Sequence, residues 1–285
     1  MIKMKRLIYK ILKIVPDKIF LKIKYRLKTG RKLNLKNPQT YNEKLQWLKL
    51  YDRKDIYTTL VDKYEVKDYI SKIIGDEYII PTLGVYDNFD DIDFDSLPNE
   101  FVIKCTHDSG GLVIVKDKNN FDKEAARKKI NASLKNNYYL YHREWPYKNV
   151  SPRIIVEKML ECDNNGQLPD YKFFCFDGKV RNMFVAVDRP NATKFNFYDS
   201  EFNKLNVSQH YPNFDYELEK PSNFEKMIEL CEKISRNLKH VRVDLYNING
   251  KIYFGEITFY HFGGFEKFSP ESFDYEMGKF IDLKK

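Results

Sequence analysis

Several short stretches of the sequence place charged side chains at the end of an apolar run. They are V-D-K-Y-E-V with Lys63, F-V-I-K with Lys104, I-I-V-E-K with Glu157 and Lys158, V-R-V-D-L-Y with Asp244, and Y-F-G-E-I-T with Glu256. Burying an unpaired ion is costly, so charges at such positions need partners or a ligand. Ammonium groups bind phosphate oxygens, and carboxylates bind Mg²⁺. These residue types are therefore the ones needed to hold a nucleoside triphosphate with its magnesium ion.

The stretch F-V-I-K-C-T-H-D-S-G-G at residues 101–111 joins Lys104 to a small polar loop that ends in Gly110 and Gly111. Glycine lets the backbone approach a ligand closely, which suits a loop that binds phosphates through its N–H groups. The alternative is a solvated lysine followed by an ordinary turn. Likewise, Asp244 and Glu256 could simply pair with Arg242 in a structural network.

Local signals predict the helices and hairpins that would position these charges. Thr40 and Glu43 form a capping-box pattern that opens a helix. The next helix is expected over residues 58–74, ended by Gly75. The strongest hairpin signals are Asp177-Gly178 and Asn249-Gly250. Further elements are expected near residues 101–104, 112–115, 121–136, 153–158, 170–176, 180–187, 224–238, 241–246 and 252–259. Alternating hairpins and helices predict an α+β fold whose two lobes meet near residue 154.

Positive charge is concentrated at the N-terminus. Residues 1–36 hold thirteen Lys and Arg residues and a single acid, Asp17, whereas the whole chain of 285 residues has a formal net charge of +8. The remainder is therefore mildly acidic, which argues against a general nucleic-acid binder.

Cations alternate with aliphatic residues in this N-terminal segment, and Pro16 interrupts the pattern. A basic amphipathic segment can lie on an anionic membrane face or meet an acidic polymer. It can equally form ordinary surface helices whose apolar side packs on the body. No apolar run is long enough to span a bilayer, and no signal-peptide core is visible.

The four cysteines and five histidines lack the spacing of a disulfide scaffold or a zinc site. The expected location is cytoplasmic, with peripheral association at the inner membrane face as a hypothesis.

Taken in order, several phrases resemble the TupA-like branch of the ATP-grasp superfamily. They are N-P-Q-T-Y-N-E-K-L-Q-W-L-K-L-Y-D-R, L-V-D-K-Y-E-V, L-P-N-E-F-V-I-K-C-T-H-D-S-G-G, R-I-I-V-E-K, D-Y-K-F-F-C-F-D-G and V-R-V-D-L-Y with Y-F-G-E-I-T-F. The resemblance implies an ATP-grasp fold, in which two α+β lobes sandwich ATP, with a basic helical segment in front. It suggests three parts, namely residues 1–57, 58–153 and 154–285.

The resemblance also implies roles for individual residues, with ATP and Mg²⁺ as cofactors. Lys63 and Lys104 would contact the α- and β-phosphates, and the backbone of residues 106–111 would close over the β- and γ-phosphates. The nucleotide-binding set is Lys63, Lys104, Thr106, Ser109, Gly110, Gly111, Glu157, Lys158, Met159, Leu160, Asp170 and Lys172, in which residues 157–160 form a hinge beside the adenine. Asp244 and Glu256 would bind Mg²⁺, and Arg242 would face the transferring phosphoryl group.

The site departs from the family pattern at one position. Many ATP-grasp enzymes have asparagine two residues after the metal-binding glutamate, whereas this chain has Thr258. Either Thr258 is a metal ligand or the metal keeps an extra water. His107 is a candidate catalytic or loop-stabilising residue, and Arg181, Arg189 and His261 are candidates for binding the substrate.

The activity implied is a carboxylate-amine ligase that works through an acyl phosphate. That branch is associated with capsule, O-antigen and teichuronopeptide genes, which suggests a uronic acid or amino acid substrate. Three alternatives remain open at this stage. They are a glycosyltransferase using Asp91-Ile92-Asp93, an ATP-dependent sugar kinase, and a non-catalytic nucleotide-binding scaffold.

Overall fold

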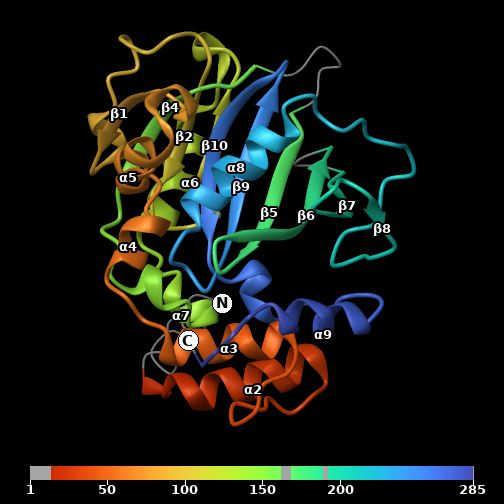
Figure 1. The fold of residues 1–285 in the computed structure, drawn as a ribbon. Helices are drawn as coiled ribbons and strands as arrows, with labels where there is room; N and C mark the ends of the chain where they lie inside the picture. The colour runs from red at the N-terminus through yellow and green to blue at the C-terminus, as the bar shows by residue number, and fades with distance from the viewer. Residues whose placement is uncertain (1–13, 162–167, 189–191, 285) are drawn as a thin grey trace. The chain divides into compact units, whose positions relative to one another are not determined.

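The computed structural model describes residues 14–161, 168–188 and 192–284, and Figure 1 shows the course of the chain. Two compact units form within these residues. Unit 1 takes the described residues of 1–53, 142–144 and 162–285, and unit 2 takes 54–141 and 145–161. The three-part division expected from the sequence differs from these units in two places. The helices before residue 53 pack with the C-terminal part of the chain, and residues 154–158 form a strand of unit 2.

Unit 2 contains an antiparallel sheet of four strands in the order β1-β4-β2-β3, counted over the described residues. The strands are β1 (Thr82–Tyr86), β2 (Phe101–Cys105), β3 (Leu112–Val115) and β4 (Ile154–Lys158). The expected hairpin of β2 and β3 is present. On β2 the side chains of Phe101, Ile103 and Cys105 are buried, and Lys104 points to the other face.

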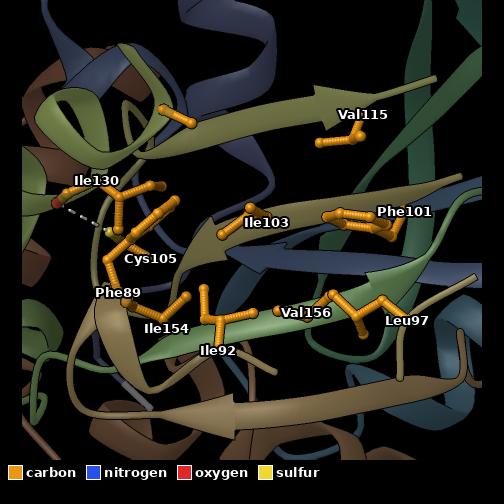
Figure 2. Packing of buried hydrophobic residues seen from close by; sticks show 11 residues of the cluster. Phe89, Ile92, Leu97, Phe101, Ile103, Cys105, Val115, Ile130, Ile154 and Val156 are labelled. Carbon is orange, nitrogen blue, oxygen red and sulfur yellow. Dashed lines mark hydrogen bonds between the residues drawn. The ribbon is translucent and has the colours of Figure 1, made fainter. Parts of the chain in front are cut away.

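The buried side of this sheet forms a continuous apolar core (Figure 2). Phe101 and Ile103 of β2 pack with Ile154 and Val156 of β4 and with Ile130. Ile130 comes from α6 (Lys123–Leu134), whose start is capped by the Asp122 side chain accepting from the Ala125 N–H at 2.8 Å. This core fixes the strands from which Lys104 and Glu157 project.

The single helix expected over residues 58–74 is wrong. The structure has two helices, α4 (Ile56–Val61) and α5 (Glu65–Ile74), separated at Asp62. Asp62 has an extended backbone, and its Oδ1 accepts from the N–H groups of Tyr64 and Glu65 at 2.8 and 3.1 Å. The aspartate thus interrupts one helix and satisfies free N–H groups at the start of the next. Unit 2 also contains most of α7 (Tyr139–His142).

Unit 1 contains an antiparallel sheet of six strands in the order β10-β9-β5-β6-β7-β8, again counted over the described residues. The strands are β5 (Asp170–Phe176), β6 (Lys179–Val187), β7 (Lys194–Asp199), β8 (Lys204–Leu205), β9 (His240–Ile248) and β10 (Lys251–Thr258). The expected hairpins at Asp177-Gly178 and Asn249-Gly250 join β5 to β6 and β9 to β10.

Helices lie on both faces of this sheet. On one face, Phe224 of α8 (Phe224–Ile234) packs on Phe173 of β5, with ring centroids 6.0 Å apart. On the other face, Tyr41 of α3 (Tyr41–Tyr51) meets Phe174 and Phe176 edge to face. The capping box expected at Thr40 and Glu43 is confirmed. Near α3 lie α2 (Asp17–Thr29) and α9 (Ser272–Lys279).

The α+β class expected from the sequence is confirmed. Both sheets are antiparallel, and helices lie between their strands in the chain. In the part of the chain that the structure describes, none of the helices has the length and apolar character needed to span a bilayer.

Candidate functional site

A cluster of two lysines around one buried carboxylate lies on the face of the unit 2 sheet opposite the apolar core. Glu157 on β4 forms ion pairs with Lys104 on β2, at 2.5 Å, and with Lys67 on α5. Lys104 lies opposite Ile155 in the register, so Glu157 is its diagonal neighbour on the same face. Burial alone would raise the pKa of Glu157, but the two lysines reverse this effect and hold that pKa below its usual value. The cluster therefore carries an ionised carboxylate and an excess of positive charge.

The two lysines of this cluster differ in their hydrogen-bond partners and in their exposure to solvent. Besides Glu157, Lys67 donates to the Ile80 carbonyl at 2.7 Å and to the Thr82 hydroxyl at 2.9 Å. The Lys104 side chain is 24% exposed. Lys67 was missed by the sequence analysis, although its spacing of four residues from Lys63 was visible. Its partner Glu157 could be identified only after β4 had been placed beside β2.

The loop expected to bind phosphates follows directly from β2. Lys63 donates from its side chain to the Asp108 carbonyl, and its backbone N–H donates to the Thr106 carbonyl at 3.1 Å. Asp108 in turn accepts from the Gly111 N–H at 3.0 Å. Lys63 and the loop therefore lie together. A role in phosphate binding stays a prediction.

Other loop residues have structural partners. His107 is buried, with Nε2 3.2 Å from the Ser133 carbonyl, and the Ser109 hydroxyl lies 3.4 Å from that of Tyr138. A Cβ on Gly111 would lie 2.6 Å from both the Cys105 sulfur and the Ser133 hydroxyl, whereas one on Gly110 would make only an ordinary contact with Asp108 Oδ2, at 3.9 Å. Gly111 is thus required by packing, and Gly110 is the position at which a ligand could approach the backbone.

The segment expected to border the adenine lies at the end of unit 2. Lys158 is exposed, and its N–H donates to the Pro81 carbonyl at 3.0 Å. Met159 and Leu160 are half-buried and follow β4. The structure gives Glu157 a side-chain role in the lysine cluster that the sequence analysis did not anticipate, and adenine contact stays a prediction.

A second charged cluster lies on β5, β9 and β10 of unit 1. The register sets Lys172 opposite Asp244 and Glu256 opposite Asp244, so the β9–β10 hairpin and β5, which is far from it in the chain, bring these side chains together. A bulge between Phe254 and Glu256 produces this register. It falls at Gly255, where a Cβ would approach the Asp244 carbonyl to 3.1 Å. Glycine therefore permits the bulge that directs Glu256 toward Asp244.

Arg242 is at the centre of this cluster. Its Nε and Nη2 donate to the two carboxylate oxygens of Asp244, each at 2.7 Å. Nη2 also lies 3.2 Å from Glu256 Oε1 and 3.0 Å from Thr258 Oγ1. Burial works against the charge of Arg242, but Asp244 outweighs it and raises the pKa of the arginine. The arginine is therefore charged at every physiological pH.

Asp170, Lys172 and Asp244 form the buried side of the same cluster. Lys172 pairs with Asp170 at 2.6 Å and with Asp244. Burial raises the pKa of Asp244, against the opposing influence of Arg242 and Lys172. The aspartate thus depends on both cations to stay ionised.

His261 holds the Arg242 guanidinium in place through a hydrogen bond. It lies in the turn η5 (His261–Gly264), and it is buried. Arg242 Nη1 donates to His261 Nδ1 at 2.7 Å, and His261 Nε2 lies 2.8 Å from Gln209 Oε1. Burial and the nearby Arg242 lower the pKa of His261 well below its usual value. A neutral imidazole with its proton on Nε2 satisfies both contacts, and Gln209 is a residue that the sequence analysis missed.

The unit 1 cluster fits a magnesium ion in composition. Glu256 and Asp244 are adjacent carboxylates, and the Glu256 side chain is 42% exposed. Mg²⁺ in phosphate-transfer sites usually takes one or two carboxylates and completes its shell with phosphates and water. Within the residues that the structure describes, no group of three or more His, Cys, Asp or Glu side chains has metal-binding geometry. Because Arg242 donates to Asp244 and Glu256, a metal would compete with it for both carboxylates. The Thr258 hydroxyl already bridges Arg242 and Glu256 Oε1, the latter at 3.3 Å.

A buried lysine and glutamate in unit 1 were also missed. Lys49 donates to Gln46 Oε1 and to the carbonyls of His142 and Gly263, at 3.0, 2.9 and 2.6 Å. Burial lowers the pKa of Lys49 to about 7 and raises the pKa of Glu144 to about 7. Lys49 stands in the phrase at residues 37–53 and Glu144 in none of the phrases, but burial of both side chains is revealed only by the tertiary structure.

The remaining candidates lie elsewhere. Arg181 is exposed near the β5–β6 turn, with its guanidinium 5.5 Å from the Phe280 ring, and Arg189 lies outside the described residues. Asp91 accepts from the Asn88 amide at 2.9 Å, and Asp93 Oδ1 accepts from the N–H groups of Asp95 and Ser96. The two aspartates of the D-x-D pattern thus stabilise local turns.

Comparison with known families identifies the class of protein. A family model described as TupA-like ATPgrasp matches residues 43–282. The chain therefore belongs to the ATP-grasp proteins and, within them, to the TupA-like family. The resemblance inferred from the sequence is confirmed, and so is the ATP-grasp fold.

The solved structures that match this chain have low sequence identity to it. D-alanine–D-alanine ligase from Bacillus anthracis is 17% identical, with a TM-score of 0.40 over 70% of this chain and 57% of that one. An L-amino acid ligase from Bacillus licheniformis is 13% identical, with a TM-score of 0.42 over 76% and 47% of the two chains. A RimK domain ATP-grasp protein from Sphaerobacter thermophilus is 10% identical, with a TM-score of 0.44 over 79% and 69%. This chain thus spans little more than half of the first ligase, and a search of curated proteins gave no match.

Proposed function

We propose that this protein is an ATP-dependent ligase that joins a carboxylate to an amine. A carboxylate oxygen of the substrate would attack the γ-phosphorus of ATP, breaking its bond to the bridging oxygen and releasing ADP. The amine would then attack the acyl carbon, inorganic phosphate would leave, and the amine would lose a proton to form the amide. Membership of the ATP-grasp proteins supports this reaction class.

The observation that carries the proposal is the arrangement around Arg242. A buried, permanently charged guanidinium beside the partly exposed Glu256 can stabilise the charge that develops on a phosphoryl group. His261 fixes this guanidinium on its far side, so little reorganisation is needed when the phosphate arrives. Asp244 and Glu256 would hold Mg²⁺, which when bound would neutralise charge on the β- and γ-phosphates.

The lysine cluster of unit 2 supplies the cations for the nucleotide. Lys104 is partly exposed and is the lysine best placed to exchange Glu157 for a phosphate oxygen. Lys63, held at the phosphate-binding loop, would assist it. Residues 157–160 would also bind the nucleotide, and we propose the same role for Asp170 and Lys172 of unit 1.

The substrate class remains part of the proposal. We infer a uronic acid or an amino acid as the carboxylate, with a role in building a bacterial surface polysaccharide such as capsule, O-antigen or teichuronopeptide. An anionic membrane surface or lipid-linked glycan would be met through residues 1–36, of which 1–13 lie outside the described residues.

An ADP-release screen tests the ligase. Uronic acids and nucleotide-linked sugars would be offered with amino acids and amines, and products identified by mass spectrometry. We expect ADP release that requires both substrates and a product with the mass of an amide. A phosphorylated sugar or a glycoside would instead indicate a kinase or a glycosyltransferase, and ADP release with no acceptor combination would favour a scaffold.

Two variants test the site assignment. Lys104→Ala and Glu256→Ala should each lower kcat/KM by about 100-fold, the usual effect of removing one group that stabilises transition-state charge. Lys72→Ala is the matched control, because Lys72 is an exposed lysine of unit 2 that pairs with Asp68 across one helical turn. Full activity in either site variant would contradict the assignment.

A further inference from the structure

Helix α2 of unit 1 has an apolar row on its outward side. Ile19, Ile23 and Leu27 follow one another at intervals of four residues, and they are 51%, 55% and 80% exposed. Residues at this spacing lie on one face of a helix. Ile14, just before the helix, is exposed as well. Isolated exposed aliphatic residues are common on protein surfaces, but a continuous row along a helix is not.

The inner side of α2 is packed independently of this row. Leu21 and Tyr25 are buried in a cluster with Leu33 and Phe265. Thr29 is buried too, and its hydroxyl donates to the Tyr25 carbonyl at 2.7 Å. The helix is therefore anchored to unit 1 by one face, so its outward apolar row contributes little to the fold. The alternative raised by the sequence, in which the apolar side of the basic segment packs on the body, accounts for the inner face only.

A basic row runs beside the apolar one. Lys18, Lys22 and Arg26 are exposed at the same spacing of four residues, each directly before a member of the apolar row. The acid of this helix is Asp17, and it already pairs with Arg53 at 2.7 Å and Arg143 at 3.1 Å. The outward face of α2 thus combines exposed aliphatic side chains with positive charge that no acid of the helix neutralises.

We propose that this outward face docks on an anionic lipid bilayer. Ile19, Ile23 and Leu27 would enter the boundary between headgroups and acyl chains, and the three cations would bind lipid phosphates at the surface. A helix of 13 residues is about 20 Å long and would lie flat in the interface. Basic side chains can keep their stems in the apolar layer with their charges at headgroup level. A nucleic acid would match the charges but not the aliphatic row, so a lipid surface fits both rows.

Vesicle co-sedimentation of the full chain tests the proposal. Vesicles of phosphatidylcholine mixed with phosphatidylglycerol would be compared with phosphatidylcholine alone. We expect binding to the anionic vesicles that weakens with added salt, and much weaker binding to the neutral ones. Absence of binding to anionic vesicles would overturn the proposal. This assay needs neither ATP nor a substrate, so its outcome is independent of the ligase proposal.

Two sets of substitutions test the basic row and the apolar row of α2 separately. Lys18→Gln, Lys22→Gln and Arg26→Gln together should weaken binding on the order of 100-fold, at about fivefold for each basic residue near an anionic surface. Ile23→Asn with Leu27→Asn should weaken it by about tenfold or more while leaving the charge unchanged. The matched control, Lys220→Gln with Lys233→Gln and Arg236→Gln, removes the same charges from exposed positions of unit 1.

Three results would contradict the proposal. An equal loss in the control would mean that net charge alone attracts the chain to the vesicle. Undiminished binding by the Asn pair would mean that the apolar row does not enter the bilayer. Conversion of a dimer to a monomer by the Asn pair, with unchanged vesicle binding, would identify the face as a contact between two copies. Circular dichroism melting would confirm that each variant is folded.

Discussion

The charged clusters of the two units use similar residues in opposite proportions. In unit 2, one carboxylate, Glu157, is shared by Lys67 and Lys104, so positive charge is in excess. In unit 1, Arg242 and Lys172 are set among the carboxylates of Asp170, Asp244 and Glu256, so negative charge is in excess. An anion such as a phosphate would be attracted to the first cluster, and a cation such as Mg²⁺ to the second.

The two clusters also differ in how burial affects their acids. The pKa of Glu157 is lowered because its lysines outweigh burial, whereas the pKa of Asp244 is raised because burial outweighs its cations. In the unit 2 cluster the partly exposed Lys104 can exchange its contact for water or a ligand at modest cost. The unit 1 cluster is a buried network in which each charge depends on its partner.

The largest effect should follow from removing the centre of the unit 1 network. Arg242→Ala leaves Asp244 buried with Lys172 alone and should lower the free energy of unfolding by about 3–5 kcal/mol. Urea unfolding followed by circular dichroism measures this change. Arg236→Ala, at an exposed arginine of the same unit, should stay within about 0.5 kcal/mol of the wild type. A loss under about 1 kcal/mol in Arg242→Ala would show that the network does not depend on its arginine.

The two lysines of unit 2 should separate stability from ligand binding. Lys67→Ala removes donors from Glu157, Ile80 and Thr82 and should destabilise the protein by about 2–3 kcal/mol. Lys104→Ala should cost about 1 kcal/mol or less, because its side chain is partly exposed. Lys104→Ala should instead weaken ATP binding more than Lys67→Ala does. Urea unfolding and isothermal titration with ATP distinguish the two, and the reverse order in either measurement would contradict this division of roles.

Lowering the pH should destabilise unit 1, because a buried neutral histidine would have to bind a proton. His240 Nδ1 donates to the Cys175 carbonyl and its Nε2 accepts from the Tyr41 hydroxyl, both at 2.9 Å. Burial lowers the pKa of His240 to about 3. Because the unfolded chain binds this proton more readily, stability is lost as pH falls from about 6.5 toward 3.

The contribution of His240 to this loss of stability is measured by comparing the wild type with His240→Asn at two pH values. Between pH 7 and 5 the wild type should lose about 2 kcal/mol more than His240→Asn, which has no proton to gain at this position. Urea unfolding at both pH values gives the four free energies. Equal losses in the two proteins would mean that His240 is not held neutral.

Glu157 of unit 2 should respond to acid differently. Its contribution to the free energy of unfolding should be retained down to about pH 4.5, since its pKa is lowered in the folded protein.

The smallest effect on stability should follow from a substitution of Thr258, the position at which this chain departs from the family pattern. Thr258→Val removes a hydroxyl that bridges Arg242 and Glu256 and should cost about 1 kcal/mol of stability. If Thr258 only bridges, the Mg²⁺ concentration needed for half-maximal activity should stay within about twofold of the wild type. A rise of tenfold or more would show that the hydroxyl binds the metal, and Thr258→Asn should then restore the affinity.

Local signals in the sequence were sufficient for much of the fold. The capping box at Thr40, the turns at Asp177-Gly178 and Asn249-Gly250, and the β2–β3 hairpin all depend on residues close in the chain. The helix over residues 58–74 failed because apolar periodicity continues through Asp62, whose side chain caps a new helix only in the folded backbone. The three-part division differed because contacts between distant segments determine which unit each one joins.

The sequence by itself determined the residue types of the site and the family to which they point. Lys104, Arg242, Asp244 and Glu256 stand in short motifs, because strand ends and a bulge glycine must be encoded locally. Only the tertiary structure decided their partners. Lys67 acquires Glu157 from another element, His261 acquires Gln209, and Lys49 is buried among carbonyl groups of remote segments. Burial and pairing depend on side chains brought together across the chain, and they decide which charges hold the fold and which remain available to a ligand.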